Sequence, residues 1–389
     1  MSNAMAKVLL VDTNFSSVPI YRALTSAGHE VHVVGANPSD CLAKQAHHYW
    51  QLDYSDIDAL SKLVEKQNFD HLIPGCTDRS YESCVALRQE RFTSLDTQEV
   101  MLAINHKATF RRVASTLGLP VPALFLDAES AVGHTVIVKP VDSFSGKGIT
   151  VLSNAGSTEI EQAIVRARDT SPSGEMLIEE FVEGQLYSHS AFHVAGKIKC
   201  DFLVQEDGTA NRFVVDTSRV VDPAEKSKLL MQLRECVEKL AGHLKLQDGL
   251  IHTQFISNGN RVWLIEMTRR CPGDLYSQLI ELTTGYPYAS SYALAFLGQA
   301  PSLYNGGVFN PVMRHTISVP AEQSFDYVRF LRALEITRYV PLSLVGDPLR
   351  SSPHSRVAIL FCHVQNQAML EELYQATLRR ELYSVSDGS

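Results

Sequence analysis

A lysine inside an otherwise apolar strand is the first residue whose position suggests chemistry. Lys139 lies in the segment TVIVKPV, where a buried charge is costly unless an anion pairs with it. A loop of mostly small and polar residues, Asp142–Lys147, follows and leads into a second strand, GITVL. Backbone N–H groups around Gly146 and Gly148 could form a cradle for an anion. Because the pattern lacks the GxxxxGK[ST] order of a P-loop, it predicts either another kind of phosphate-binding loop or an ordinary hairpin.

A second set of polar residues lies on a predicted β-hairpin. Leu250–Ile256 and Arg261–Met267 read as two strands that flank the turn SNGN. With a three- or four-residue loop, Gln254 falls opposite Leu264–Ile265 and diagonal to Glu266, about 7–8 Å away at Cα. Two side-chain oxygens at that spacing suit Mg²⁺, which completes its octahedron with phosphates and water. The alternative is a hairpin with unrelated polar residues, but the apolar character of both strands favours the metal site.

Four further residues are candidates for substrate contact. Asp78 and Arg79 follow a predicted strand, at the sheet end where α/β proteins bind ligands. Such residues more often cap the next helix. His252 lies on the first strand of the predicted hairpin and Arg269 follows the second. For His252, packing in the core is the more common outcome.

Composition and charge restrict the class of protein. The chain has 389 residues, 45% hydrophobic and 20% charged, which predicts two or three domains with ample core. A net charge of −8 argues against a surface for nucleic acid or anionic membrane. The seven cysteines lack CxxC pairs and metal-ligand spacing, which indicates reduced thiols in a cytoplasmic protein. No apolar run approaches the roughly 18 residues of a membrane span.

The order of predicted elements indicates an α/β region followed by an α+β region. Strands at Lys7–Asp12, Glu30–Gly35 and Asp70–Pro74 alternate with helices, which predicts a parallel sheet. The first turn lacks GxGxxG, so a dinucleotide site is not expected. Later expected elements are helices at Ser157–Arg168, Asp222–Leu244, Leu275–Leu282 and Tyr288–Leu297, and strands at Met176–Val182, Ala191–Gln205 and Phe213–Val215.

Taken in order, these motifs resemble those of the ATP-grasp superfamily. The matching parts are Lys107 at the start of a helix, VIVKP with a glycine loop, IEEFVEG, and Gln254 followed by Glu266 and a terminal arginine. Members include carboxylate–amine ligases, biotin carboxylase and carbamoyl-phosphate synthetase. The resemblance implies an ATP-grasp fold preceded by a Rossmann-like parallel α/β domain. The expected domains are 5–105 (Rossmann-like), 106–305 (ATP-grasp, with a lid at about 120–182) and 306–389 (a C-terminal α+β extension packed on the ATP-grasp domain).

The resemblance also implies a role for each matching residue. Lys107 and Lys139 would hold the α- and β-phosphates of ATP, with Lys139 also catalytic. Glu179 would accept a hydrogen bond from the adenine amino group. Arg270 would act at the reacting carboxylate or γ-phosphate. The other residues implied to bind ATP, through the loop over the γ-phosphate and the edge that reads adenine, are Ser145, Gly146, Lys147, Gly148, Glu180, Phe181 and Val182. Glu183 is the candidate to substitute for the family's ribose-binding glutamate.

Three positions depart from the family pattern. Leu186 stands where ligases carry a ribose-binding glutamate, and Thr268 stands where an asparagine often binds metal. Gln254 stands where the first metal ligand is usually glutamate, although carbamoyl-phosphate synthetase also has glutamine there. Gln254 and Glu266 remain the implied ligands of Mg²⁺ or Mn²⁺. Since a carboxylate binds a hard cation more strongly than an amide, Gln254→Glu is expected to tighten the dependence on Mg²⁺.

The function implied by the resemblance is that of an ATP-dependent carboxylate–amine ligase for small metabolites or amino acids. ATP would phosphorylate the carboxylate, and an amine would attack the acyl phosphate to give an amide, ADP and phosphate. The alternatives are activation of bicarbonate, as in carbamoyl-phosphate synthetase or biotin carboxylase, and a non-catalytic nucleotide-binding protein. The expected partners are a small carboxylate and an amine, without nucleic acid or membrane. A homodimer is compatible with the sequence.

Overall fold

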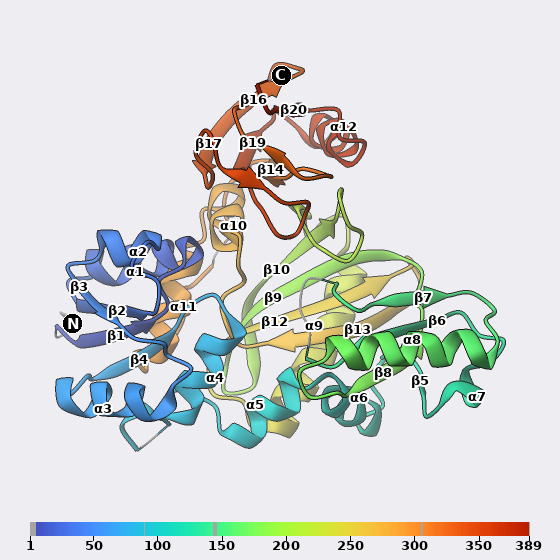
Figure 1. The fold of residues 1–389 in the computed structure, drawn as a ribbon. Helices are drawn as coiled ribbons and strands as arrows, with labels where there is room; N and C mark the ends of the chain where they lie inside the picture. Colours follow the sequence, from blue (N-terminus) through green and yellow to red (C-terminus); the bar gives the residue numbers. More distant parts are fainter. Residues whose placement is uncertain (1–4, 89, 143–145, 305, 389) are drawn as a thin grey trace.

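The N-terminal part of the chain is a parallel α/β layer (Figure 1). The computed structural model describes residues 5–88, 90–142, 146–304 and 306–388. The strands lie in the order β3-β2-β1-β4 and are parallel, as predicted. The strands are β1 (Lys7–Val11), β2 (Glu30–Gly35), β3 (His48–Gln51) and β4 (His71–Pro74). The intervening helices are α1 (Val18–Ser26), α2 (Cys41–Gln45), α3 (Ile57–Gln67) and α4 (Asp78–Ala86), with 3-10 turns at Phe15–Ser17 and Glu90–Phe92.

A buried carboxylate fixes the carboxyl end of this sheet. Asp12, at the end of β1, accepts hydrogen bonds from the Ser17 hydroxyl (2.7 Å) and from the backbone N–H of Cys76 (3.1 Å). These bonds tie the loop after β1 to the loop after β4. Thr77 then caps α4 by accepting a hydrogen bond from the N–H of Ser80 (3.1 Å), so Asp78 lies in the first turn of α4.

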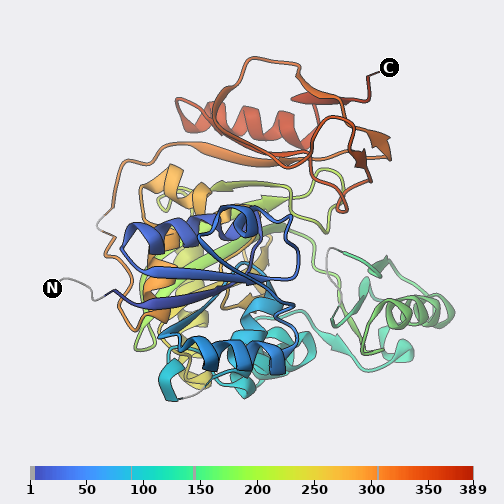
Figure 2. The same ribbon diagram turned by 60° about the vertical axis from the view of Figure 1, so that its left-hand side comes forward.

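A small antiparallel sheet follows, which we call the lid sheet. Its strands are β5 (Leu124–Phe125), β6 (Val136–Pro140), β7 (Thr150–Leu152) and β8 (Met176–Glu180), in the order β5-β8-β6-β7. Helices α7 (Ala128–Ala131) and α8 (Ser157–Thr170) pack on it, whereas α5 (Gln98–Asn105) and α6 (Lys107–Thr116) precede it in the chain and pack into the core of the main sheet. Ile160, Ala163 and Ile164 of α8 pack on Val136 and Val138 of β6 in a separate small core. In Figure 2 this unit lies apart from the other layers.

The main sheet has eight antiparallel strands in the order β13-β12-β9-β10-β11-β14-β19-β17. They are β9 (Gln185–Val194), β10 (Lys197–Asp207), β11 (Thr217–Val220), β12 (Gly249–Ser257), β13 (Val262–Thr268), β14 (Val312–Ile317), β17 (Glu335–Pro341) and β19 (Ala358–His363). Helix α9 (Ser227–Leu244) packs on one face, and α10 (Tyr276–Thr284) and α11 (Tyr288–Phe296) pack on the other. The core under α10 and α11 continues into the parallel sheet, so the two sheets are held together.

The last part of the chain extends the main sheet. Its remaining elements are β15 (Gln323–Ser324), β16 (Tyr327–Phe330), β18 (Pro348–Leu349), β20 (Tyr383–Ser386) and α12 (Gln367–Leu378). The two pairs β15–β18 and β16–β20 form small separate sheets. The division into domains at residues 105 and 305 stays a prediction. None of the helices in the described part of the chain combines the length and apolarity of a membrane span.

The expected strand at Ala191–Gln205 is divided by a turn. Strands β9 and β10 meet at Ala195 and Gly196, which both have positive φ (51° and 73°). Positive φ at both central residues is the geometry of a tight hairpin turn. Alanine rarely adopts it, so composition does not signal this turn.

The expected strand at Phe213–Val215 is wrong. The carboxylate of Asp216 accepts hydrogen bonds from the N–H (2.9 Å) and hydroxyl (2.7 Å) of Thr209, which closes residues 209–216 into a loop. The backbone therefore forms a loop there, and β11 begins at Thr217. Helix α9 likewise begins at Ser227, later than the expected Asp222.

Candidate active site

The lid sheet, the main sheet and helices α4 to α6 enclose a cavity of about 1240 Å³. Most of the residues singled out in the sequence meet in its lining, although they come from segments far apart in the chain. These residues are Asp78, Arg79, Lys107, Lys139, Gly146, Glu179, Glu180, Phe181, Val182, Glu183, Gln254, Glu266 and Arg270. The cavity therefore joins the lysine loop and the polar hairpin in one site.

Lys139 takes part in a buried ion-pair network. Its ammonium contacts the carboxylate of Glu179 on the neighbouring strand β8. The same carboxylate forms an ion pair with Arg111, whose Nε lies 2.6 Å from Oε1. Although burial raises it, the charges of Lys139 and Arg111 hold the pKa of Glu179 below its usual value. Both cations occupy this carboxylate here, and the hydrogen bond that Glu179 is predicted to accept from an adenine amino group stays a prediction.

Arg111 has no role in the predictions from sequence, yet it connects the lid sheet to the main sheet. Its side chain is completely buried, and its Nη1 donates to the carbonyl of Ile265 on β13 (2.6 Å). One sequence signal was available. Lys107 and Arg111 are four residues apart on α6, so they lie on one side of that helix. Lys107 Nζ donates to the carbonyl of Val141 at the end of the lid strand (3.1 Å).

The polar hairpin differs in register from the prediction. Gln254 is the direct partner of Glu266, whereas Phe255 pairs with Leu264. Ile265 is thus an extra residue on β13, a β-bulge, and its carbonyl is the one that accepts from Arg111. Directly opposed side chains lie about 4.5–5.5 Å apart at Cβ, closer than the expected diagonal pair. The bulge therefore improves the fit of Gln254 and Glu266 to one cation.

A buried acid lies behind this pair. Glu206 on β10 is 4% exposed, and its Oε2 accepts a hydrogen bond from Gln254 Nε2 (2.7 Å). Its Oε1 accepts from the hydroxyl of Ser188 (2.8 Å). Burial raises the pKa of Glu206 to about 7, against the lowering effect of these hydrogen bonds and of Arg314. Sequence reasoning missed Glu206, for which the only signal is a charge at the end of the apolar run FLVQ.

Arg270, also in the cavity lining, is held in a fixed orientation by Asp78. Its Nε and Nη2 donate to the two carboxylate oxygens of Asp78 (2.8 and 3.1 Å). Thr268 also donates to Asp78 (3.3 Å). Although burial raises it, the charge of Arg270 keeps the pKa of Asp78 below its usual value. The first residue of α4 thus fixes the plane of the arginine predicted to meet the reacting group.

Two candidate substrate residues do not reach the cavity. Arg269 and Arg270 both follow the last residue of β13, but Arg269 lies outside the cavity lining and its Nε pairs with Asp96 (2.8 Å). His252 is 6% exposed and packs edge-on against Tyr276, with 5.1 Å between ring centres. Burial lowers the pKa of His252 to about 3, so its ring is neutral. We therefore withdraw both residues from the candidate site.

The predicted glycine loop is only partly covered by the structure. Ser145 lies outside the described residues. Gly146 lines the cavity, whereas Lys147 and Gly148 are not part of its lining. Gly148 has φ of 73°, and a Cβ there would lie 2.7 Å from Thr170 Cβ and 2.9 Å from Pro140 Cγ. This glycine is therefore required by close packing within the lid.

The 181–184 linker, which joins β8 to β9, forms a wall of the cavity. The N–H of Phe181 donates to the carbonyl of Thr135 (2.9 Å), so it is not available to a ligand. Arg212, from the loop between β10 and β11, places its guanidinium 5.0 Å from the centre of the Phe181 ring. Arg212 also lines the cavity and has no sequence-based prediction. It is a further cation in the cavity lining.

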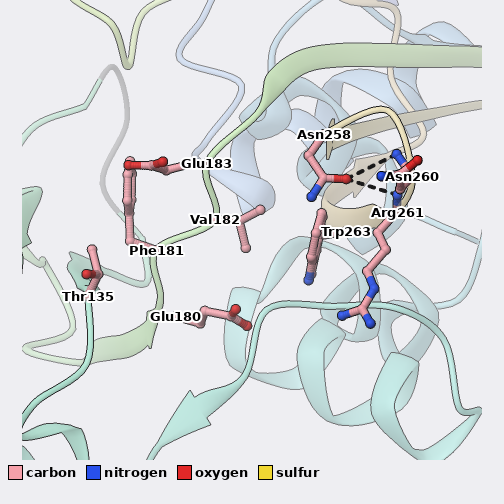
Figure 3. A pocket seen from close by; sticks show the side chains of 9 residues that line it. All are labelled: Thr135, Glu180, Phe181, Val182, Glu183, Asn258, Asn260, Arg261 and Trp263. Atoms are coloured by element: carbon pink, nitrogen blue, oxygen red, sulfur yellow. Dashed lines mark hydrogen bonds between the residues drawn. The ribbon is translucent and has the colours of Figure 1, made fainter.

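A second recess of about 560 Å³ lies on the other side of this linker (Figure 3). Glu180 and Val182 face it from the lid side, and Trp263 and Arg261 face it from the hairpin. The turn of this hairpin is ordered by Asn258, whose Oδ1 accepts from the N–H groups of residues 260 and 261 (3.2 and 3.0 Å). Trp263 is one of two tryptophans in the chain, so its fluorescence can report on the linker.

Comparison with known proteins links this site to one family. Residues 132–278 match the model of the ATP-grasp domain. The formate-dependent phosphoribosylglycinamide formyltransferase of Xanthomonas axonopodis pv. citri is 26% identical over 385 residues, covering 92% of this chain and 91% of that protein. The protein of the same name from Stutzerimonas stutzeri is 23% identical over 281 residues, covering 69% of this chain and 70% of that protein.

Solved structures show the same fold at lower identity. Phosphoribosylglycinamide synthetase from Anaerococcus prevotii gives a TM-score of 0.77 at 14% identity, covering 98% of this chain and 100% of that one. L-amino acid ligase from Bacillus licheniformis gives a TM-score of 0.77 at 15% identity, covering 100% of both chains. These likenesses extend over all the layers described above.

Proposed function

Because the chain belongs to the ATP-grasp superfamily of ATP-dependent ligases, we propose that it joins a small carboxylate to an amine through an acyl phosphate. The observation that carries this proposal is the single cavity lining shared by Lys107, Lys139, the Gln254–Glu266 pair and Arg270. The curated relatives are named for a formate-dependent reaction and a solved relative for ligation of L-amino acids, which supports a small acid here. We keep a cytoplasmic location and a homodimer as parts of the proposal.

Different residues of the cavity would bind the phosphates of ATP and orient the reacting group. In the proposed complex, Lys107 and Lys139 hold the ATP phosphates, and Lys139 exchanges its contact with Glu179 for a phosphate. Arg111 then keeps the Glu179 carboxylate paired. Arg270, held in plane by Asp78, orients the carboxylate or γ-phosphate.

The residues at the hairpin fit a hard cation. Glu266 offers an exposed carboxylate, and Gln254 lies directly opposite it. When bound there, Mg²⁺ or Mn²⁺ would neutralise charge on the transferring phosphoryl group. Both positions lie in the cavity lining together with Lys107 and Lys139.

The test is a phosphate-release screen with small carboxylates and amines supplied in pairs. We expect ADP and phosphate to form in equal amounts only when both members of one pair are present. Formate, amino acids and bicarbonate are included among the acids. Release with bicarbonate alone would favour bicarbonate activation instead. Nucleotide binding without turnover for any pair would favour the non-catalytic alternative.

Lys139→Ala is expected to weaken ATP binding by ~1.5–3 kcal/mol, or roughly ten- to a hundred-fold, because a charge-assisted contact is lost. Affinity is measured by calorimetry and by Trp263 fluorescence in a Trp50→Phe background, where Trp263 is the only tryptophan. Lys197→Ala is the control, since Lys197 lies outside the cavity lining and its side chain is 72% exposed. Unchanged affinity in Lys139→Ala would show that Lys139 does not hold a phosphate.

A further inference from the structure

An amide at the first metal position raises a problem of orientation. Gln254 has an oxygen that can bind a cation and an NH₂ group that would repel one. A glutamate has no such choice, because both of its terminal atoms are oxygens. Metal binding by Gln254 therefore requires that a neighbouring residue orient the amide, so that its oxygen and not its NH₂ group faces Glu266.

Glu206 supplies that specification. It accepts from Gln254 Nε2 at 2.7 Å, and a carboxylate offers only acceptors to an amide. Its other oxygen accepts from the Ser188 hydroxyl at 2.8 Å, and the Tyr276 hydroxyl lies 2.9 Å from Ser188 Oγ. Glu206, Ser188 and Tyr276 are all buried, so these contacts fix the carboxylate from behind.

We propose that Glu206 is a positioning residue that turns the NH₂ group of Gln254 away from Glu266 and leaves its oxygen facing the metal position. The proposal rests on the proposed function only in assuming that a nucleotide-bound cation occupies the hairpin. Outer groups that orient a ligand in this way commonly change metal affinity by about 10- to 100-fold.

The arrangement reverses the expectation for Gln254→Glu. A glutamate at 254 would place a second carboxylate against Glu206, where the amide now donates a hydrogen bond. Two carboxylates in contact do not both ionise readily and would hold a shared proton, so this variant is expected to bind metal less well than the wild type. Exchanging the two groups, in Glu206→Gln with Gln254→Glu, restores one amide and one carboxylate in contact.

The experiment compares four proteins in a Trp50→Phe background: the parent, Glu206→Gln, Gln254→Glu and the double variant. The affinity for the non-hydrolysable ATP analogue AMPPNP is measured by Trp263 fluorescence with Mn²⁺ and, separately, with EDTA. The ratio of the two affinities is the gain due to the metal. We expect Glu206→Gln to lower this gain about 10- to 100-fold in the parent and to raise it in the Gln254→Glu protein.

Ser188→Ala is the matched control, since it removes a hydrogen bond to Glu206 but leaves the contact with Gln254. A smaller loss of the metal gain is expected there. A loss of equal size in both backgrounds would mean that Glu206 has only a structural role, and no loss in the parent would also overturn the proposal. If Glu206→Gln does not fold, Gln254→Glu decides alone, because a tighter Mn²⁺ dependence would contradict the proposal.

These measurements require no turnover. A reversal of sign in the four-protein comparison would therefore stand even if the carboxylate–amine screen fails. Conversely, active ligation together with equal losses in both backgrounds would remove the role of Glu206 and leave the proposed function intact.

Discussion

Replacing Glu266 by glutamine is expected to lower the rate of ADP formation by about 10²–10³-fold while the protein stays folded. Glu266 is the only carboxylate of the Gln254–Glu266 pair, so the variant presents two amides to the cation. A hard cation binds neutral amide oxygens weakly, and charge on the transferring phosphoryl group then lacks compensation. Because the Glu266 side chain is exposed, its substitution should cost the fold little, within about 0.5 kcal/mol.

This expectation is checked by measuring ADP formation against Mg²⁺ concentration, together with the melting temperature. Glu235→Gln is the control, because Glu235 is an exposed glutamate on α9, which packs on the opposite face of the main sheet from α10 and α11. Wild-type turnover in Glu266→Gln would mean that the hairpin is structural and that the metal lies elsewhere.

The two hairpins could be located from sequence because each is a local pattern. The first hairpin was found from Lys139 in an apolar strand, and the second from Gln254 and Glu266 on paired strands. All three residues line the cavity. The register of the second hairpin could not be derived in the same way. An extra residue at Ile265 shifts the pairing by one position, and its stabilising contact comes from Arg111, 154 residues earlier in the chain.

The residues that sequence reasoning missed have partners that are distant in the chain. Glu206 and Gln254 are separated by 48 positions in the chain. Their strands, β10 and β12, both flank β9 in the main sheet, so the two side chains meet across β9. Arg111 meets Glu179 across 68 positions. Local periodicity predicts which face of an element is buried. It does not predict which charged residue of a neighbouring element that face will contact. Arg269 is a further example, since its buried partner Asp96 lies 173 positions earlier in the chain.

The second large effect is expected from Arg111→Met, which should lower the free energy of unfolding by ~3–5 kcal/mol. Arg111 is fully buried, and its removal leaves the Glu179 carboxylate with Lys139 as its remaining cation. It also leaves the carbonyl of the Ile265 bulge without its donor. Breaking one side of a buried ion pair costs far more than removing the pair, because the remaining charge stays in an apolar surrounding.

Two comparisons make this result specific. Arg112→Met is the matched control, because Arg112 is the next residue of α6 and is exposed, so it should unfold like the parent. Arg111→Met combined with Glu179→Gln should lose less stability than the sum of the single variants, since the second change neutralises the unpaired acid. Unfolding in urea is followed by Trp263 fluorescence in the Trp50→Phe background, so that the signal comes from the hairpin which Arg111 contacts. If Arg111→Met unfolds at the same urea concentration as Arg112→Met, then Lys139 alone balances Glu179, and Arg111 does not hold the lid sheet to the main sheet.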